Sequence, residues 1–77
     1  MEFKAVWNGS YGPASLAVHK LNKKGIPAYI SVGECYTDIL TPEQVGKTIT
    51  TLIFSLVPDN YWAIYSRENS NQNWRQI

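Results

Sequence analysis

Apolar and polar residues alternate along residues 2–8, where Phe3, Ala5 and Trp7 occupy every second position. A period of two is typical of a β-strand that buries one of its faces. Residues 8–13 contain two Gly and one Pro, a composition that interrupts regular structure. The sequence therefore predicts an opening strand that ends in a loop.

Residues 14–25 fit two different patterns. As a helix, this segment gathers four apolar residues on one face and places Gly25 just past its end. Those residues are Ala14, Ala17, Val18 and Leu21. As a hairpin, residues 15–21 pair with residues 26–32 across a turn that closes at Gly25, and apolar side chains again share one face. We favour the hairpin and keep the helix as the alternative.

A second helix is predicted from its start signal at Thr41. Thr41 is a suitable N-cap, Pro42 suits the first helical position, and Gln44 can complete a capping box. The apolar residues that follow recur at helical spacing along one face. They are Val45, Ile49, Leu52, Ile53 and Leu56. Pro58 is expected to end the helix.

Two further strands are expected at residues 35–40 and 61–65, where aromatic and β-branched residues are frequent. The predicted fold class is α+β, a small antiparallel sheet of about four strands packed on one long helix. If residues 14–25 are helical, the order becomes βαββαβ, the ferredoxin-like arrangement. We expect one domain over residues 1–65 and a polar, mobile C-terminal tail over residues 66–77.

Length and charge limit the classes of function. The chain has 77 residues, which is enough for one small core. Its net charge of +1 creates no strong electrostatic field to attract nucleic acid. The single Cys35 cannot build a disulfide framework or a multi-cysteine zinc site. We expect no metal, no cofactor and no membrane partner. Since the N-terminus lacks signal-peptide character, we expect a cytoplasmic protein.

Aromatic residues are the strongest functional signal, at 13% of the chain. Alternation along the strands should place about half of them on a face that the helix does not cover. Tyr, Trp and Arg are the residue types that dominate protein interfaces. The predicted partner-binding residues are Tyr29, Tyr36, Tyr61, Tyr65, Trp74 and Arg75. Packing of these rings within a thin core and stacking on single-stranded nucleic acid are the alternatives, and the scattered charges argue against stacking.

The loop after the first strand is a second candidate site. Its glycines would let backbone N–H groups approach a ligand. The predicted ligand-binding residues are Gly9, Ser10, Tyr11 and Gly12. His19 and Cys35 are each the only residue of their type, which leaves few combinations of nucleophile and base. We therefore predict no catalytic residues and no enzymatic activity.

The function expected from the sequence is that of a small non-catalytic binding protein. It would occupy a surface of a larger protein as an inhibitor or adaptor, in the manner of small proteins encoded by phages and mobile elements. The alternative is a homo-oligomeric module that binds or sequesters a small ligand or nucleotide, because the free edges of a small sheet pair readily. We do not expect nucleic acid as a partner.

Overall fold

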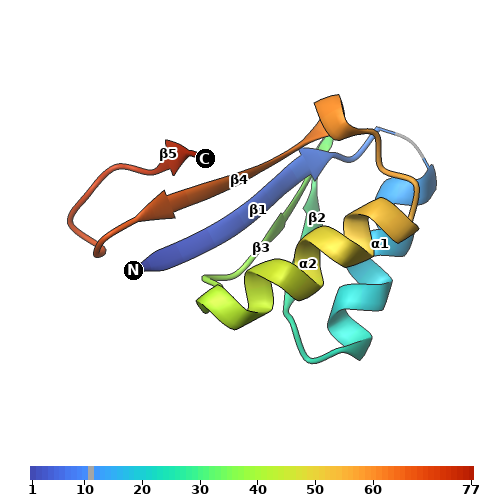
Figure 1. The fold of residues 1–77 in the computed structure, drawn as a ribbon. Helices are drawn as coiled ribbons and strands as arrows, with labels where there is room; N and C mark the ends of the chain where they lie inside the picture. Colours follow the sequence, from blue (N-terminus) through green and yellow to red (C-terminus); the bar gives the residue numbers. More distant parts are fainter. Residues whose placement is uncertain (11) are drawn as a thin grey trace.

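The computed structural model describes residues 1–10 and 12–77. In this part of the chain, two α-helices pack on one face of a five-stranded antiparallel sheet (Figure 1). The elements are β1 (Glu2–Asn8), α1 (Gly12–Lys23), β2 (Ala28–Ser31), β3 (Glu34–Thr37), α2 (Pro42–Phe54), a 3-10 helix η1 (Asp59–Tyr61), β4 (Trp62–Arg67) and β5 (Arg75–Gln76). The predicted α+β class is confirmed. The sheet packs on two helices, where the favoured arrangement had one.

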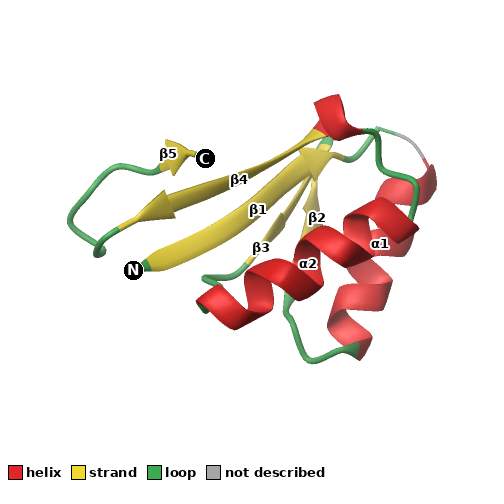
Figure 2. Ribbon diagram, viewed as in Figure 1, coloured by secondary structure: helices red, strands yellow, loops and turns green. Residues whose placement is uncertain are grey.

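The strands follow the order β2-β3-β1-β4-β5, so β1 is central. Through β4 the elements run βαββαβ, the order of the ferredoxin-like alternative. Both helices lie on the same side of the sheet, and β4 and β5 extend beyond them (Figure 2). In the part of the chain that the structure describes, no helix covers the opposite face of the sheet (Figure 2).

The favoured hairpin over residues 14–25 is wrong, because this segment forms α1. Its four apolar residues at helical spacing are all buried. Gly25 adopts a φ of 80°, and Ile26 N donates to the Leu21 carbonyl oxygen, as in a helix end closed by a left-handed residue. Asn22 then exchanges two hydrogen bonds with the backbone of Ala28, which attaches the end of α1 to the start of β2.

The predicted start of α2 is confirmed in detail. Thr41 Oγ1 accepts from the Gln44 backbone N–H, and Gln44 Oε1 accepts from the Thr41 backbone N–H. The helix ends at Phe54, earlier than Pro58. Of the predicted apolar face only Leu52 is buried within the helix, and its buried neighbours are the hydroxyl residues Thr48 and Thr51. Lys24 Nζ donates to Thr51 Oγ1 at 2.7 Å, which holds this hydroxyl side of α2 toward the end of α1.

The core lies between the sheet and the helices. Ala5 and Trp7 of β1 are buried there, as the alternation predicts, and Trp7 Nε1 donates to the Ala14 carbonyl oxygen of α1 at 3.2 Å. The C-terminal segment pairs with the sheet. β4 continues to Arg67, past the expected boundary at residue 65, and the chain then returns to pair β5 with β4.

Candidate functional site

The open face of the sheet can be assigned from the strand register. Cross-strand partners share a face, and neighbours along a strand alternate. Because Ala5 and Trp7 face the helices, Lys4 and Val6 face away from them. Tyr36 is paired with Val6 and with Tyr29, and Tyr65 is paired with Lys4. Three of the predicted partner-binding tyrosines therefore lie on the open face.

Tyr29 and Tyr36 form an aromatic pair at the β2–β3 side of this face. Their ring centroids are 5.4 Å apart with an interplanar angle of 34°. The Tyr29 hydroxyl donates to Asp38 Oδ2 at 2.8 Å. This hydrogen bond to a carboxylate, together with a little burial and the negative charge of Asp38, raises the pKa of Tyr29 above its ordinary value. The pair is exposed but held in one arrangement, which suits a preformed binding surface.

Trp74 occupies the other side of the open face. Its ring lies 4.1 Å from Arg67 Cζ and 4.8 Å from Lys4 Nζ, measured to the ring centroid. Lys4 Nζ also lies 5.8 Å from the centroid of the Tyr65 ring. Arg67 Nε is bound to Glu2 Oε1 at 2.6 Å, between residues that face each other across β1 and β4. Cation–π contacts and one ion pair thus fix the C-terminal segment over the sheet.

Tyr61 and Arg75 are not among the strand residues that the register places on the open face. Tyr61 lies in η1 and not in a strand, because the chain makes one more turn after Pro58. Arg75 is paired with Ser66, whose partner on β1 is Phe3 on the helix side. Four of the six predicted partner-binding residues are therefore brought together, while Arg75 lies on the helix side and Tyr61 lines a cleft with Tyr65 at the end of β4.

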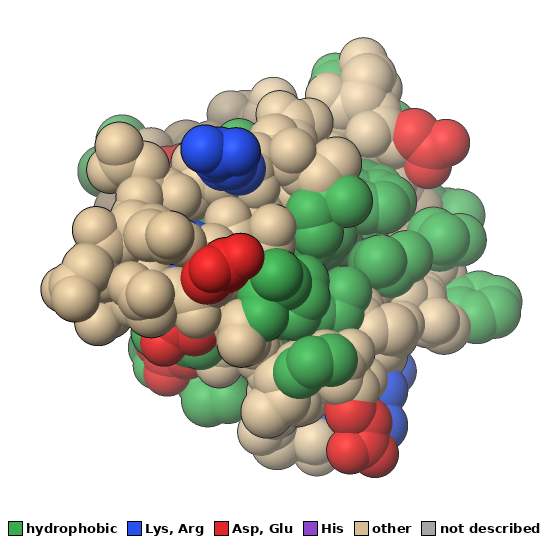
Figure 3. Space-filling model, turned by 60° about the vertical axis from the view of Figure 1, so that its left-hand side comes forward, with side chains coloured by type: hydrophobic (Ala, Val, Ile, Leu, Met, Phe, Trp, Pro, Cys, Tyr) green, Lys and Arg blue, Asp and Glu red, His purple; other side chains and the backbone are tan. Residues whose placement is uncertain are grey.

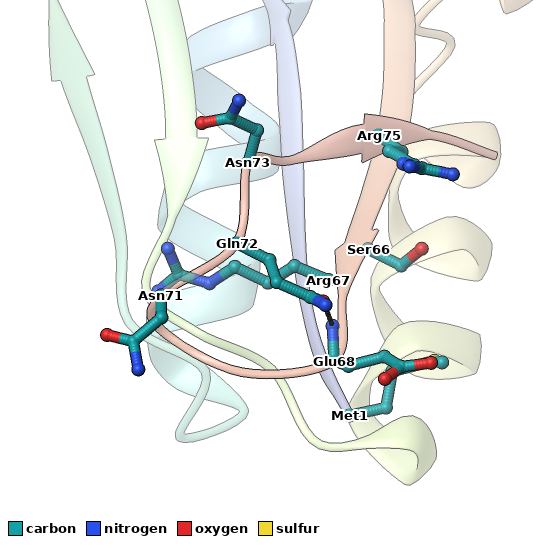
Figure 4. A pocket seen from close by; sticks show the side chains of 8 residues that line it. All are labelled: Met1, Ser66, Arg67, Glu68, Asn71, Gln72, Asn73 and Arg75. Carbon is teal, nitrogen blue, oxygen red and sulfur yellow. Dashed lines mark hydrogen bonds between the residues drawn. The ribbon is translucent and has the colours of Figure 1, made fainter.

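The segment between β4 and β5 surrounds a polar cavity of about 630 Å³. It is lined by Met1, Ser66, Arg67, Glu68, Asn71, Gln72, Asn73 and Arg75 (Figure 4). Gln72 Oε1 accepts from the Glu68 backbone N–H at 3.0 Å and closes the loop. Arg67 and Arg75 point away from each other, so their charges do not converge on one ligand position (Figure 4). Sequence reasoning missed Arg67 and Lys4. Arg67 follows Tyr65 by two residues, a spacing that places both on one face of a strand and was a usable signal.

The loop after β1 has a packing role that the sequence did not suggest. Gly9 N donates to the Gly33 carbonyl oxygen at 3.1 Å, and a Cβ on Gly9 would lie 3.1 Å from Cys35 Sγ. Ser10 N donates to Asn8 Oδ1 at the end of β1. Gly12 is the first residue of α1, and the predicted ligand residue Tyr11 lies outside the described residues.

A cleft of about 450 Å³ opens beside this loop, at the end of β1 and β4. Its lining includes Ser10 of the loop, Tyr61 of η1, and Glu34 and Tyr65 of the sheet. Of the predicted ligand-binding residues that the structure describes, Ser10 lines this cleft.

The remaining chemistry-bearing residues are separated. Cys35 is buried on the helix side of β3, and burial raises the pKa of its thiol. His19 lies on the exposed side of α1. Among the described residues, no group of three or more His, Cys, Asp or Glu side chains could hold a metal ion. In the same residues, neither helix is long and apolar enough to cross a bilayer.

The chain was compared with protein families, curated proteins and solved structures. No protein-family model, no curated protein and no solved structure matches the chain.

Proposed function

We propose that this protein binds a larger protein through the open face of its sheet and acts by occupying a surface of that partner. The observation that carries the proposal is the gathering of Tyr29, Tyr36, Tyr65 and Trp74 on one face without a helix over it. Tyr and Trp bury large areas at small cost in side-chain entropy, and they are enriched among the residues that dominate binding energy. An inhibitor or adaptor acts through such a surface and needs no catalytic groups.

Charge favours a protein partner over single-stranded nucleic acid. A strand of nucleic acid needs a continuous line of unpaired cations beside its stacking rings. On this face Arg67 is already paired with Glu2, and Lys4 lies near the rings of Trp74 and Tyr65. Carboxylates interrupt the other end, where Asp38 accepts the Tyr29 hydrogen bond. Mixed charge around aromatic residues is the usual composition of a protein interface.

The test is affinity capture from the native cell extract, followed by measurement of the dissociation constant for the captured partner. The double variant Tyr29→Ala, Tyr36→Ala should weaken binding at least tenfold, which corresponds to about 1.4 kcal/mol. The control is Leu16→Ala, since Leu16 is 45% exposed and Tyr29 is 41% exposed, but Leu16 belongs to α1 on the other face of the sheet (Figure 1). Circular dichroism verifies that each variant is folded. Equal binding by wild type and double variant would refute the proposal.

Small-ligand or nucleotide binding is a second candidate, favoured by the 450 Å³ cleft that Ser10 and Tyr61 line. In this case a polar metabolite or nucleotide should raise the melting temperature of the wild type. Filling the cleft with Ser10→Trp should abolish that increase. A library of such ligands that leaves the wild-type melting temperature unchanged would eliminate this candidate.

A further inference from the structure

The outer side of α2 carries apolar side chains that the fold leaves uncovered. Its exposed stripe consists of Gly46, Thr50, Ile53 and Phe54, at the helical spacing i, i+4, i+7 and i+8. Phe54 is 76% exposed. The stripe lies on the side of the molecule opposite the open face of the sheet, since both helices cover the other face (Figure 1). Hydrophobic side chains also gather in a broad band in the space-filling view, with acidic side chains at its margins (Figure 3).

Leu56 adds a second unusual exposure next to the stripe. It has a φ of 64°, a left-handed conformation that favours glycine, and it is 78% exposed. Val57 N donates to the Leu52 carbonyl oxygen, so the backbone there closes α2 as a glycine would. The chain therefore accepts both backbone strain and an exposed leucine at one position. The left-handed backbone closes α2 within the monomer, whereas the exposed leucine side chain has no such role and is a reason to look for a binding role.

Gly46 lies at the other end of the same stripe and also has no explanation within the monomer. Glycine lowers the stability of a helix interior relative to alanine. A Cβ at Gly46 would meet nothing within 4 Å, so no neighbour among residues 1–10 and 12–77 requires glycine there. With Lys24, Lys47 and Thr50, Gly46 lines a hollow of about 530 Å³. The stripe thus carries a hollow at its start and a protruding ring at its end.

We propose that α2 is the interface of a homodimer, in which Phe54 of each copy fills the hollow at Gly46 of the other. Gly46 and Phe54 are eight residues apart, about 12 Å along the helix, with Thr50 midway. Two antiparallel copies related by a two-fold axis at Thr50 therefore bring each ring against the opposite hollow. A two-fold interface of this kind uses the same patch on both copies.

The charges around the hollow suit an aromatic occupant. Lys24 and Lys47 line it, and an ammonium group is attracted to the face of an aromatic ring. A copy of this chain supplies such a ring at Phe54, at the distance that the two-fold arrangement requires. This match between lysine and ring, and the match between protrusion and hollow, are our reasons for choosing a second copy as the occupant.

The contact between two α2 helices is small, which favours a weak dimer. α2 has 13 residues and is about 20 Å long, so two such helices bury less than the roughly 800 Å² per partner of a standard interface. We therefore expect association in the micromolar range and not a permanent dimer. The open sheet faces of the two copies remain free, so the dimer would present two copies of the surface described above. This inference is independent of the proposed function.

Sedimentation equilibrium over about 10 µM to about 1 mM, a range that brackets a micromolar dissociation constant, tests the proposal. The wild-type mass should rise from 8.7 kDa toward twice that value. Phe54→Gln removes the ring, and Gly46→Leu fills the hollow with a good helix former. Both variants should keep the monomer mass across the range, with circular dichroism confirming the fold. Leu16→Gln changes an exposed leucine of α1 and should dimerise as the wild type does.

A wild-type mass that stays at 8.7 kDa at the highest concentration would overturn the proposal. Unchanged dimerisation of Phe54→Gln or Gly46→Leu would also overturn it, as would loss of dimerisation in Leu16→Gln or a mass that grows beyond two copies. The Tyr29→Ala, Tyr36→Ala variant should still dimerise. Its behaviour separates this proposal from the partner-binding one, because each can fail while the other holds.

Discussion

The indole ring of Trp74 lies over the guanidinium group of Arg67, with 4.1 Å between Arg67 Cζ and the ring centroid. The two residues stand at opposite ends of the polar segment that connects β4 to β5. Only two residue pairs, Tyr65 with Gln76 and Ser66 with Arg75, join β5 to the sheet. A two-residue strand has little stability of its own, so the cation–π contacts of the Trp74 ring with Arg67 and Lys4 help to hold the C-terminal segment on the sheet.

Replacement of Trp74 by Ala should therefore release β5. Each cation–π contact at a partly exposed site contributes about 0.5–1 kcal/mol, so the two contacts predict a loss of about 1–2 kcal/mol in the free energy of unfolding. Urea denaturation measures this loss. Amide exchange at Ile77, whose N–H donates to the Ile64 carbonyl oxygen, should become faster. Trp74→Tyr keeps a ring and should lose less, and unchanged exchange at Ile77 in Trp74→Ala would contradict the attachment.

The hydrogen bond from Tyr29 to Asp38 predicts a specific titration. Because the Asp38 carboxylate holds the proton on the Tyr29 hydroxyl, Asp38→Asn should lower the pKa of Tyr29 toward the ordinary value of about 10. Glu34→Gln, which removes a carboxylate without this bond, should leave it unchanged. Carbon-13 NMR of the tyrosine rings measures both. A Tyr29 pKa that is equal in wild type and Asp38→Asn would show that the bond does not form in solution.

The same hydrogen bond determines the sign of a pH effect on stability. The raised pKa means that the folded protein binds the Tyr29 proton more tightly than the unfolded chain. Its stabilising contribution is therefore complete below about pH 10, the ordinary tyrosine pKa, and is lost as the pH rises through the higher folded value. Urea denaturation across this range should show a steeper decrease for wild type than for Tyr29→Phe. Parallel decreases would contradict the linkage.

The structure assigns Gly9 to packing, which a pair of alanine variants can verify. A Cβ at Gly9 would lie 3.1 Å from Cys35 Sγ and 3.2 Å from the Glu34 backbone nitrogen, so Gly9→Ala should cost about 1–3 kcal/mol. At Gly12 a Cβ would meet nothing within 4 Å. Gly12→Ala should therefore remain within about 0.5 kcal/mol of wild type in urea denaturation. Similar losses in both variants would indicate a shared loop effect instead.

Local signals explain which elements the sequence predicts well. The start of α2 depends on three adjacent residues, Thr41, Pro42 and Gln44, and their capping box forms as expected. β1 depends on strict alternation, and its two ends match the expected residues 2–8. At the start of α2, neighbours in the sequence are also the partners in the structure. In β1 the alternation alone marks the strand, although its partners on β3 and β4 lie far away in the sequence.

The prediction for residues 14–25 is wrong because it depends on contacts outside the segment. The same apolar residues satisfy a helix face and a hairpin face, so periodicity alone cannot separate the two. Contacts outside the segment decide the outcome, including the hydrogen bonds of Asn22 to Ala28 and the indole bond of Trp7 to the Ala14 carbonyl. Sequence spacing does not reveal such contacts.

The open face was predictable only in part. Alternation places Tyr29, Tyr36 and Tyr65 away from the helices once the strands are known. The position of Trp74 depends on the chain reversing after Arg67, in a polar segment whose composition predicts a tail. Aromatic residues favour strands and therefore predict a strand at Tyr61, yet the turn after Pro58 places it in η1.

The buried hydroxyl side of α2 allows a final prediction in which two similar substitutions differ. Thr48 Oγ1 is buried and has no hydrogen-bond partner among the described residues. Thr48→Val keeps the shape and removes an unsatisfied polar group, so it should raise the free energy of unfolding by about 1 kcal/mol or more. Thr51 is equally buried, but its hydroxyl accepts from Lys24 Nζ and donates to the Lys47 carbonyl oxygen. Thr51→Val should therefore lower the free energy of unfolding by about 1 kcal/mol. Urea denaturation of both variants checks the pair, and a loss of stability in Thr48→Val would mean that its hydroxyl finds a partner in solution.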